Sequence, residues 1–415
     1  MHKILIITES LDVNDSSGTK GRVALIQNLS KAGFQLKVYH YTRKELSING
    51  IACVTVKERR LTPWHLISKF QLLLQRLLGL NLNKQIENIV GFSFAFFNDS
   101  LSIKKAIQNE NPNDYDWILT LSKAGSFRPH KALLGLPQWH SKWLAYIHDP
   151  YPMHSFPRPY DWVEPGHQHK RDFFLKVAKM CRYALYPSQL LGEWMESYYG
   201  PLKGKRIIIP HQMMSPPPEP KVLPDYFNPQ HFTVLHAGGL MSARNPTGLI
   251  NAFKQLLEHF PDAQSHSSLL FLGPANRYTR VFQEQQATMP QLYSSDTYVP
   301  FETVYALQCH ASVNVILEAK GPLSPFLPGK FPHCIAAGRP VLLLGPYYSE
   351  CRRLLKEEYP YWSEIDDVES MYLHLVNLYM QWKQHPGEQY QDFKELEEYL
   401  SEGYLNKVIQ KLEQN

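Results

Sequence analysis

The sequence predicts an α/β protein built from two doubly wound, Rossmann-like domains that face a cleft. The length of 415 residues is about that of two ordinary domains. In both halves, short apolar runs typical of buried strands alternate with helical patterns, which indicates βαβ units and parallel sheets. A proline-rich segment divides the halves, with six prolines between residues 215 and 230.

The chain begins with a strand, a loop, a helix and a second strand. Residues 3–8 are an apolar run, and residues 9–21 are predicted to form a polar loop. Residues 22–32 carry apolar side chains at helical spacing, and residues 36–41 are the next apolar run. This order predicts a parallel strand pair with a right-handed crossover.

The same alternation continues along the chain. We expect a first domain over residues 1–212, a linker over 213–230, a second domain over 231–390 and a C-terminal helix over 391–415. The sequence leaves open whether that helix crosses back to the first domain. The further predicted strands are residues 115–120, 143–147, 183–186 and 207–210 in the first half and 232–236, 268–272, 313–317 and 341–344 in the second.

The composition limits the class of protein. Hydrophobic residues make up 44% and charged residues 20%, which is enough for two buried cores. The formal net charge of +5 fits an anionic ligand or an anionic membrane surface and is too small to indicate nucleic-acid binding. Five scattered cysteines without a Cys-x-x-Cys pair predict a reduced, cytoplasmic compartment and no structural zinc. We expect no signal peptide and no membrane span.

The most informative segment is residues 324–341, Ser-Pro-Phe-Leu-Pro-Gly-Lys-Phe-Pro-His-Cys-Ile-Ala-Ala-Gly-Arg-Pro-Val. A turn through Pro328 and Gly329 delivers Lys330 to the start of a short apolar helix, and Gly338 then ends that helix. A cation beside the free N–H groups of a helix start predicts an anion site.

A second segment in the same half points to the same chemistry. Gly238 and Gly239 follow a predicted strand, and Arg244 and Asn245 precede the next helix. A glycine pair permits close approach to a phosphate, and an arginine binds one bidentately. We therefore predict that Arg244 and Lys330 converge on a diphosphate. The alternative is a pair of unrelated surface cations.

The two segments resemble the donor-site segments of family-4 glycosyltransferases of the GT-B fold. The resemblance implies that they hold the diphosphate and ribose of a nucleotide sugar. It also reveals departures, because His333 and Pro325 stand where the family has two glutamates. Polysaccharide-associated members that carry Ser-Pro-Phe-Leu-Pro-x-Lys are the most similar. His333 is predicted either to bond a ribose hydroxyl or to be structural, and Glu318 is a nearby carboxylate without an assigned role.

The loop after the first strand gives a weaker signal. Ser17 and Gly18 resemble the family's Gly-Gly loop, which faces the donor phosphate. The spacing fits neither a Walker loop nor Gly-x-Gly-x-x-Gly, so a nicotinamide enzyme is not indicated.

His148 and Asp149 end a predicted strand in the first half and are the candidate catalytic residues. They resemble a His-Asp-Pro segment of related transferases and would supply a base or a ligand for sugar hydroxyls. The alternative is an aspartate that caps a turn. The acceptor is expected near residues 14–22 and 148–154. The resemblance implies retention at the anomeric carbon, and His148 or Asp149 would be the base if the reaction inverts.

Residues 57–84 begin with basic side chains and continue as an amphipathic helix with Trp64. This pattern indicates either peripheral contact with an anionic membrane or a helix that packs on its own sheet.

The function we predict is that of a hexosyltransferase-type glycosyltransferase of polysaccharide biosynthesis. It would move sugar from a nucleotide-sugar donor to a glycan or lipid-linked glycan. No Asp-x-Asp motif stands in a suitable place, so we expect no metal and no cofactor besides the donor. The expected location is the cytoplasm, with contact to the inner membrane face left open. The alternatives are an inactive binding protein of the same fold and a sugar-nucleotide epimerase.

Overall fold

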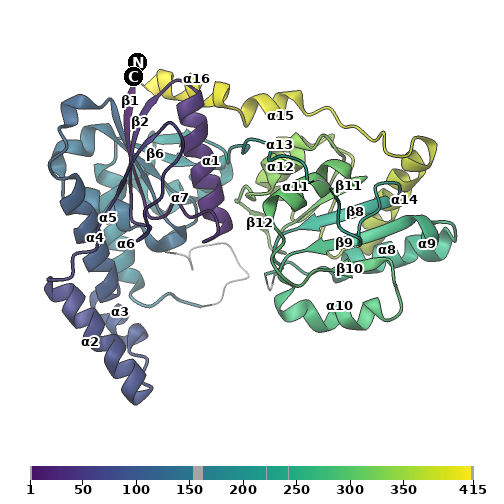
Figure 1. Cartoon of the computed structure of the whole chain (residues 1–415), viewed down its shortest axis with the longest axis horizontal. Coiled ribbons are helices and arrows are strands. Elements are labelled where there is room, and N and C mark those ends of the chain that lie inside the picture. The colour runs from purple at the N-terminus through teal and green to yellow at the C-terminus, as the bar shows by residue number, and fades with distance from the viewer. Residues whose placement is uncertain (1, 153–161, 221, 242, 413–415) are drawn as a thin grey trace. The chain divides into compact units, whose positions relative to one another are not determined.

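The computed structural model describes residues 2–152, 162–220, 222–241 and 243–412 (Figure 1). The chain divides into two compact units. Unit 1 takes the described residues up to 212 together with those from 401 onward, and unit 2 takes those from 213 to 400.

Unit 1 is built on a sheet of seven parallel strands in the order β3-β2-β1-β4-β5-β6-β7. The strand order changes direction between β1 and β4, which is where ligands bind in open α/β sheets. The strands are β1 (Lys3–Thr8), β2 (Gln35–His40), β3 (Ala52–Thr55), β4 (Trp117–Leu121), β5 (Trp143–Tyr146), β6 (Tyr183–Tyr186) and β7 (Arg206–Ile208).

Both faces of this sheet are covered by helices, because alternate side chains of each strand point to opposite sides. Ile4 and Ile6 of β1 pack in one cluster with α1 and α16, and Leu5 and Ile7 pack in another with α4, α5 and α6. The helices of unit 1 are α1 (Ser17–Lys31), α2 (Pro63–Leu78), α3 (Asn83–Val90), α4 (Phe94–Ile107), α5 (Arg128–Leu134), α6 (His167–Met180), α7 (Gln189–Tyr198) and α16 (Glu402–Leu412).

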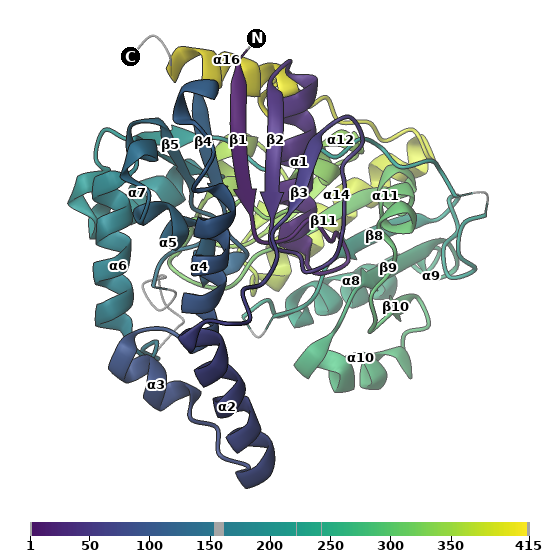
Figure 2. The ribbon, with the colours of Figure 1, turned by 60° about the vertical axis from the view of Figure 1, so that its left-hand side comes forward.

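Two helices of unit 1 lie outside this layered core. Figure 2 shows α2 and α3 projecting beyond the sheet and the helices that cover it. Across both helices only His65 is buried. The packing alternative for residues 57–84 is therefore wrong for most of the segment, since its apolar side chains do not cover the sheet.

Unit 2 repeats the architecture with six parallel strands in the order β10-β9-β8-β11-β13-β15 and a separate pair, β12-β14. Its strands are β8 (Phe232–Ala237), β9 (Ser267–Leu272), β10 (Leu292–Ser294), β11 (Val313–Leu317), β12 (Leu323–Ser324), β13 (Val341–Leu344), β14 (Tyr348–Ser349) and β15 (Trp362–Ser363). Its helices are α8 (Thr247–His259), α9 (Ala263–His266), α10 (Thr279–Gln286), α11 (Phe301–His310), α12 (Phe331–Ala336), α13 (Glu350–Leu355), α14 (Val368–Gln384) and α15 (Lys394–Tyr399).

Two elements differ from the sequence prediction. The first helix begins at Ser17, inside the predicted loop, because the Ser16 side chain accepts a hydrogen bond from the backbone N–H of Thr19 at 3.2 Å. In place of one helix over residues 391–415, the structure has α15 in unit 2 and α16 in unit 1. Within the described residues, no helix combines the length and the apolar composition that crossing a membrane requires.

The final helix belongs to the core of unit 1 (Figure 1). Leu405, Ile409 and Leu412 of α16 are buried in the same cluster as Ile4 and other side chains of β1 and α1. The Asn406 amide donates a hydrogen bond to the carbonyl of Ala32, at the end of α1, at 2.7 Å. Helix α16 thus supplies part of the apolar layer on one face of the sheet.

We predict that Ile409→Ala lowers the free energy of unfolding of unit 1 by about 2–4 kcal/mol, because it leaves a cavity in a closed apolar cluster. Urea denaturation measures the change. Gln410→Ala, at an exposed position of the same helix, is the control and should change it by less than about 0.5 kcal/mol. Equal effects of the two substitutions would show that α16 does not contribute to this core.

Candidate functional site

Lys330 occupies the centre of the candidate site in unit 2. It is the residue before α12, and its ammonium nitrogen lies 3.2 Å from Nε2 and 3.3 Å from Nδ1 of His236, in β8. A Cβ atom on Gly238 would lie 3.3 Å from the same nitrogen. The φ of Gly238 is 131°, a backbone conformation that favours glycine, and the absence of a side chain lets the ammonium approach closely.

Burial and the charge of Arg244 act against the charge of Lys330, and the carboxylate of Glu318 favours it by a smaller amount. Burial lowers the pKa of the Lys330 ammonium to about 7, and Arg244 acts in the same direction. Burial and these two cations hold the pKa of His236 well below its usual range, so its imidazole is neutral at pH 7. An anion bound here would favour the charged form of the lysine. Their attraction would be stronger than in water, because the surroundings have a lower dielectric constant.

Glu318 is the acidic residue of this site. It directly follows β11, is buried, and accepts a hydrogen bond from the Ser324 hydroxyl at 2.9 Å. Burial raises the pKa of Glu318 to about 7, and the Arg244 charge opposes that rise. A Cβ on Gly345 would lie 2.7 Å from Oε2 of Glu318, so the carboxylate lies tightly against the chain after β13.

The other residues that the sequence singled out in unit 2 lie in varied positions. The backbone of Gly239 lies near the loop after β9, since a Cβ there would be 3.7 Å from the carbonyl of Pro274. The Asn245 side chain accepts a hydrogen bond from Thr247 N at 3.0 Å, at the start of α8. Pro328 accepts a turn hydrogen bond from Phe331 N at 2.9 Å, and Gly329 is exposed.

His333, where the resemblance expects a glutamate, lies against two aromatic side chains of α11. Its ring centroid is 4.8 Å from that of Phe301 and 6.0 Å from that of Tyr305. Pro325, the other departure, is buried. Gly338 follows α12 with φ of 61°, which confirms the predicted helix end.

The candidate site in unit 1 lies at the carboxyl end of its sheet, around the buried side chain of Arg22. The guanidinium donates to the carbonyl of Ser122, after β4, at 3.0 Å and to the Thr19 hydroxyl at 2.6 Å. Burial lowers the pKa of Arg22 to about 10, although Glu9, Asp15 and Asp149 favour its charge. Arg22 lies within the segment 14–22 where the acceptor is expected, but no role of its own was predicted for it from the sequence; its place at the start of the predicted helix after the first strand was the available signal.

The predicted catalytic pair follows β5 and lies within the field of Arg22. Burial raises the pKa of Asp149 to about 6, and Arg22 opposes the rise. Burial, Arg22 and His211 together hold the pKa of His148 well below its usual value. The rings of His148 and His211 are stacked with centroids 6.4 Å apart. At pH 7, Asp149 is mostly ionised and the two imidazoles are neutral, so the carboxylate is the most basic of the three groups.

Ser17 and Gly18 lie in the first turn of α1 rather than in a loop. A Cβ on Gly18 would lie 3.4 Å from Nη1 of Arg22, so this turn passes close to the guanidinium. The predicted acceptor segment 148–154 includes Met153 and His154, which lie outside the described residues.

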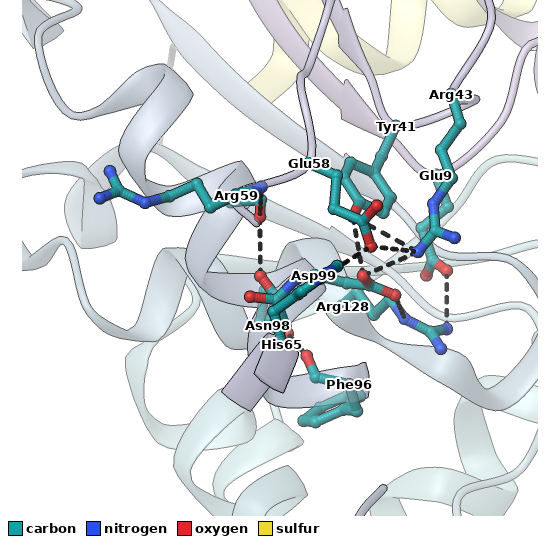
Figure 3. Close-up of polar contacts among 12 residues, drawn as sticks. Glu9, Tyr41, Arg43, Glu58, Arg59, His65, Phe96, Asn98, Asp99 and Arg128 are labelled. Carbon is teal, nitrogen blue, oxygen red and sulfur yellow. Dashed lines mark hydrogen bonds and ion pairs between the residues drawn. The ribbon is translucent and has the colours of Figure 1, made fainter. Parts of the chain in front are cut away.

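A network of ion pairs fixes the end of β1 to the neighbouring helices (Figure 3). Glu9, which follows β1, accepts from Nη1 of Arg128 at 3.2 Å, and Nε of Arg128 donates to Asp99 of α4 at 2.9 Å. Asp99 also accepts from the Tyr41 hydroxyl at 2.8 Å and from Arg43 at 3.0 Å. The exposed Arg43, the partly buried Arg128 and two buried carboxylates thus hold the chain after β1 and β2 in one arrangement.

Solved structures share this fold, although their sequences differ widely from this one. An α,α-trehalose-phosphate synthase (UDP-forming) from Burkholderia vietnamiensis aligns over 98% of this chain and 96% of its own, with 13% identity and a TM-score of 0.59. The HepE protein of Anabaena, in complex with UDP and glucose, aligns over 99% of each chain, with 11% identity and a TM-score of 0.53. A glycosyltransferase from Rickettsia africae covers 99% of this chain and 93% of its own, with 10% identity and a TM-score of 0.55.

No protein-family model matches the sequence, and no curated protein sequence matches it. At these identities the likeness establishes the fold, which is the GT-B fold of two Rossmann-like domains.

We predict that Glu318→Gln reduces the loss of stability of unit 2 as pH rises from about 5 to about 7. The folded-state pKa is raised from 4.5 to about 7, so the folded protein binds more protons than the unfolded chain in this interval, and wild-type stability falls as pH rises. Thermal unfolding across this pH range measures the difference. The control is Glu302→Gln, at an exposed glutamate of the same unit, which should keep the wild-type pH dependence. A wild-type pH dependence in Glu318→Gln would contradict the prediction, because it would show that the Glu318 carboxylate is solvated.

Proposed function

We propose that this protein is a glycosyltransferase that moves a sugar from a nucleotide-sugar donor to a glycan or a lipid-linked glycan. One observation carries the proposal: the Lys330 ammonium lies against Gly238 and the neutral His236, at the strand ends of unit 2, within the field of Arg244. The fold supports it, because proteins of this fold include structures with UDP and glucose and with UDP-2-fluoro glucose bound.

The chemistry of this site follows from charge. Breaking the bond between a sugar and a diphosphate develops negative charge on the leaving group, and preorganised cations stabilise that charge. In the proposed mechanism Lys330 and Arg244 supply the two positive charges, without a metal ion. A lysine whose pKa is about 7 in the free protein takes up a proton as the diphosphate binds, so donor binding completes the electrostatic site.

We further propose that the second domain, residues 231–390, binds the donor and that the first, residues 1–212, binds the acceptor. For the acceptor side we assign Asp149, with a pKa near 6 under the influence of Arg22, to a sugar hydroxyl. In a retaining reaction it orients that hydroxyl, and in an inverting reaction it removes the proton. We also propose that the reaction retains the configuration of the anomeric carbon and needs no metal ion. The proposed enzyme takes part in polysaccharide synthesis in the cytoplasm, beside a membrane.

An inactive sugar-nucleotide-binding protein is the second candidate, because His333 and Pro325 replace the two expected carboxylates. Incubation with a panel of nucleotide sugars and acceptor extracts separates the two functions. Release of the nucleoside diphosphate supports the transferase, and binding without turnover of any donor supports the inactive protein. Product analysis without acceptor would reveal an epimerase.

We predict that Lys330→Met and Arg244→Met each weaken UDP binding by about 10- to 100-fold, since each removes a charge-assisted contact worth about 1.5–3 kcal/mol. Isothermal titration calorimetry measures the dissociation constants. Lys254→Met removes an exposed cation from α8 in the same unit and should leave binding unchanged. Wild-type affinity in both site variants would refute the assignment of the two cations.

The pH dependence of UDP binding is a separate prediction. Affinity should fall as pH rises above about 7, approaching tenfold per pH unit, because the free protein loses the Lys330 proton there while a terminal phosphate is already fully ionised. Lys330→Arg keeps its charge at all these pH values and should bind with a nearly flat profile. A flat wild-type profile from about pH 6.5 to about pH 9 would contradict the lowered pKa.

A further inference from the structure

The α2–α3 hairpin, residues 63–90, has an exposed apolar surface. None of the described residues of unit 1 covers this surface. Leu77 is 70% exposed and Ile89 is 73% exposed, and α3 has no buried residue at all. Apolar patches of this extent on a folded chain mark a surface that contacts something else. The most exposed apolar side chains of the hairpin include Leu66, Phe70, Leu73, Leu77, Leu78 and Ile89.

The two ends of helix α2 are specified by its own sequence, while Trp64 of α2 packs on Phe97 of α4 and Glu87 of α3 pairs with Lys170 of α6. Thr62 caps α2 by accepting a hydrogen bond from His65 N at 3.1 Å, and Pro63 occupies the first helical turn. Gly79 ends α2 in the left-handed region with φ of 66°. The apolar side chains are thus presented on a defined helix, so their exposure is a property of a folded element.

The charge of this segment identifies what covers it. Residues 57–90, the hairpin and the stretch of chain that leads into it, contain two acidic side chains, Glu58 and Glu87, and Glu87 is paired with Lys170 of α6 at 2.8 Å. A second copy of the chain would bring two strongly basic surfaces together, whereas an anionic lipid bilayer offers both an apolar phase and the opposite charge. The six basic side chains of the segment, all exposed, are Lys57, Arg59, Arg60, Lys69, Arg76 and Lys84.

A groove at the root of the hairpin points to the same class of ligand. It has a volume of about 660 Å³, and Trp64 of α2 and Phe97 of α4 form part of its wall with ring centroids 4.9 Å apart. Lys104, Lys131 and Lys176 also line it, and none of the described side chains in its wall is acidic. Burial lowers the pKa of Lys131, and the charge of Lys176 acts in the same direction, so these two ammonium groups lie close enough to repel each other. An apolar wall beside clustered lysines fits a lipid phosphate and the start of its acyl chain.

The root of the hairpin is also tied to the candidate acceptor side of unit 1 (Figure 3). His65 lies 3.6 Å from Glu58, and Glu58 lies 3.4 Å from Arg43. Arg43 joins the network of Asp99, Arg128 and Glu9 described above. A surface that holds the hairpin would therefore stand at a fixed position relative to the strand ends of unit 1.

We propose that the α2–α3 hairpin seats unit 1 on an anionic lipid bilayer, with its apolar side chains among the acyl chains and the three groove lysines on lipid phosphates. The proposal gives the proposed glycosyltransferase a location for a lipid-linked acceptor. It is tested without a donor, so its failure leaves the donor site unaffected.

The test is flotation of the full-length protein with vesicles of phosphatidylcholine alone and of phosphatidylcholine with about one quarter phosphatidylglycerol. Wild-type protein should float with the anionic vesicles and bind the neutral ones at least about tenfold more weakly. Leu73→Ser/Leu77→Ser should reduce binding to anionic vesicles by about tenfold or more, since two exposed leucines lose their transfer to the acyl phase. Leu373→Ser, at a 58% exposed leucine in unit 2, is the matched control and should bind as wild type.

A second set of variants tests the groove. Replacing Lys104, Lys131 and Lys176 together by glutamine should reduce the preference for anionic vesicles by about tenfold or more, while replacement by arginine should retain it. A circular dichroism spectrum and a melting temperature equal to those of the wild type show that each variant is folded. The proposal is overturned if wild-type protein ignores anionic vesicles or if the double serine variant floats as wild type does. It is equally overturned if sedimentation shows that the hairpin leucines hold two copies of the chain together.

Discussion

The proposed function depends on one lysine that the fold holds in an unfavourable electrostatic position. Lys330 is brought against Gly238 and His236 by an apolar helix on one side and a parallel strand on the other, with Arg244 nearby. His236 is neutral and Arg244 repels the lysine, and the favourable effect of Glu318 is smaller than the effects of burial and of Arg244. The free energy gained by burying the apolar residues of β8 and α12 holds the lysine in this unfavourable position. An anion that binds there would remove the electrostatic penalty. This is the physical basis for assigning a diphosphate to the site.

Unit 1 uses a buried cation in a different way. Arg22 is satisfied in part by Ser122 and Thr19, and its charge limits how far burial raises the pKa of Asp149. The result is a carboxylate that stays mostly ionised at neutral pH although it is half-buried. Each unit thus places its titratable groups at the carboxyl edge of its own parallel sheet, where strand ends and helix starts meet.

Much of the fold could be predicted from the sequence, and the reason is local. Each predicted strand overlaps a strand of the structure and ends within two residues of it, because buried parallel strands are short apolar runs between polar breaks. The predicted start of α1 was wrong because the prediction relied on apolar periodicity, which begins only later in the helix. The helix in fact begins where the Ser16 side chain caps its first turn. The contact of Lys330 with His236 joins residues 94 apart, and it depends on strand order, which periodicity does not encode. Likewise, amphipathic spacing identified the helix at residues 57–84 but carried no information about what covers its apolar side.

The measurement that tests the account most directly is an NMR titration of the lysine side chains in protein labelled with ¹³C at lysine Cε, with Lys330→Arg used to assign the resonance. The account predicts that the Lys330 ammonium titrates near pH 7 in the free protein and that saturating UDP moves its pKa upward by more than about one unit. A Lys330 resonance that titrates above about pH 9.5 in the free protein, and that UDP leaves in place, would contradict it.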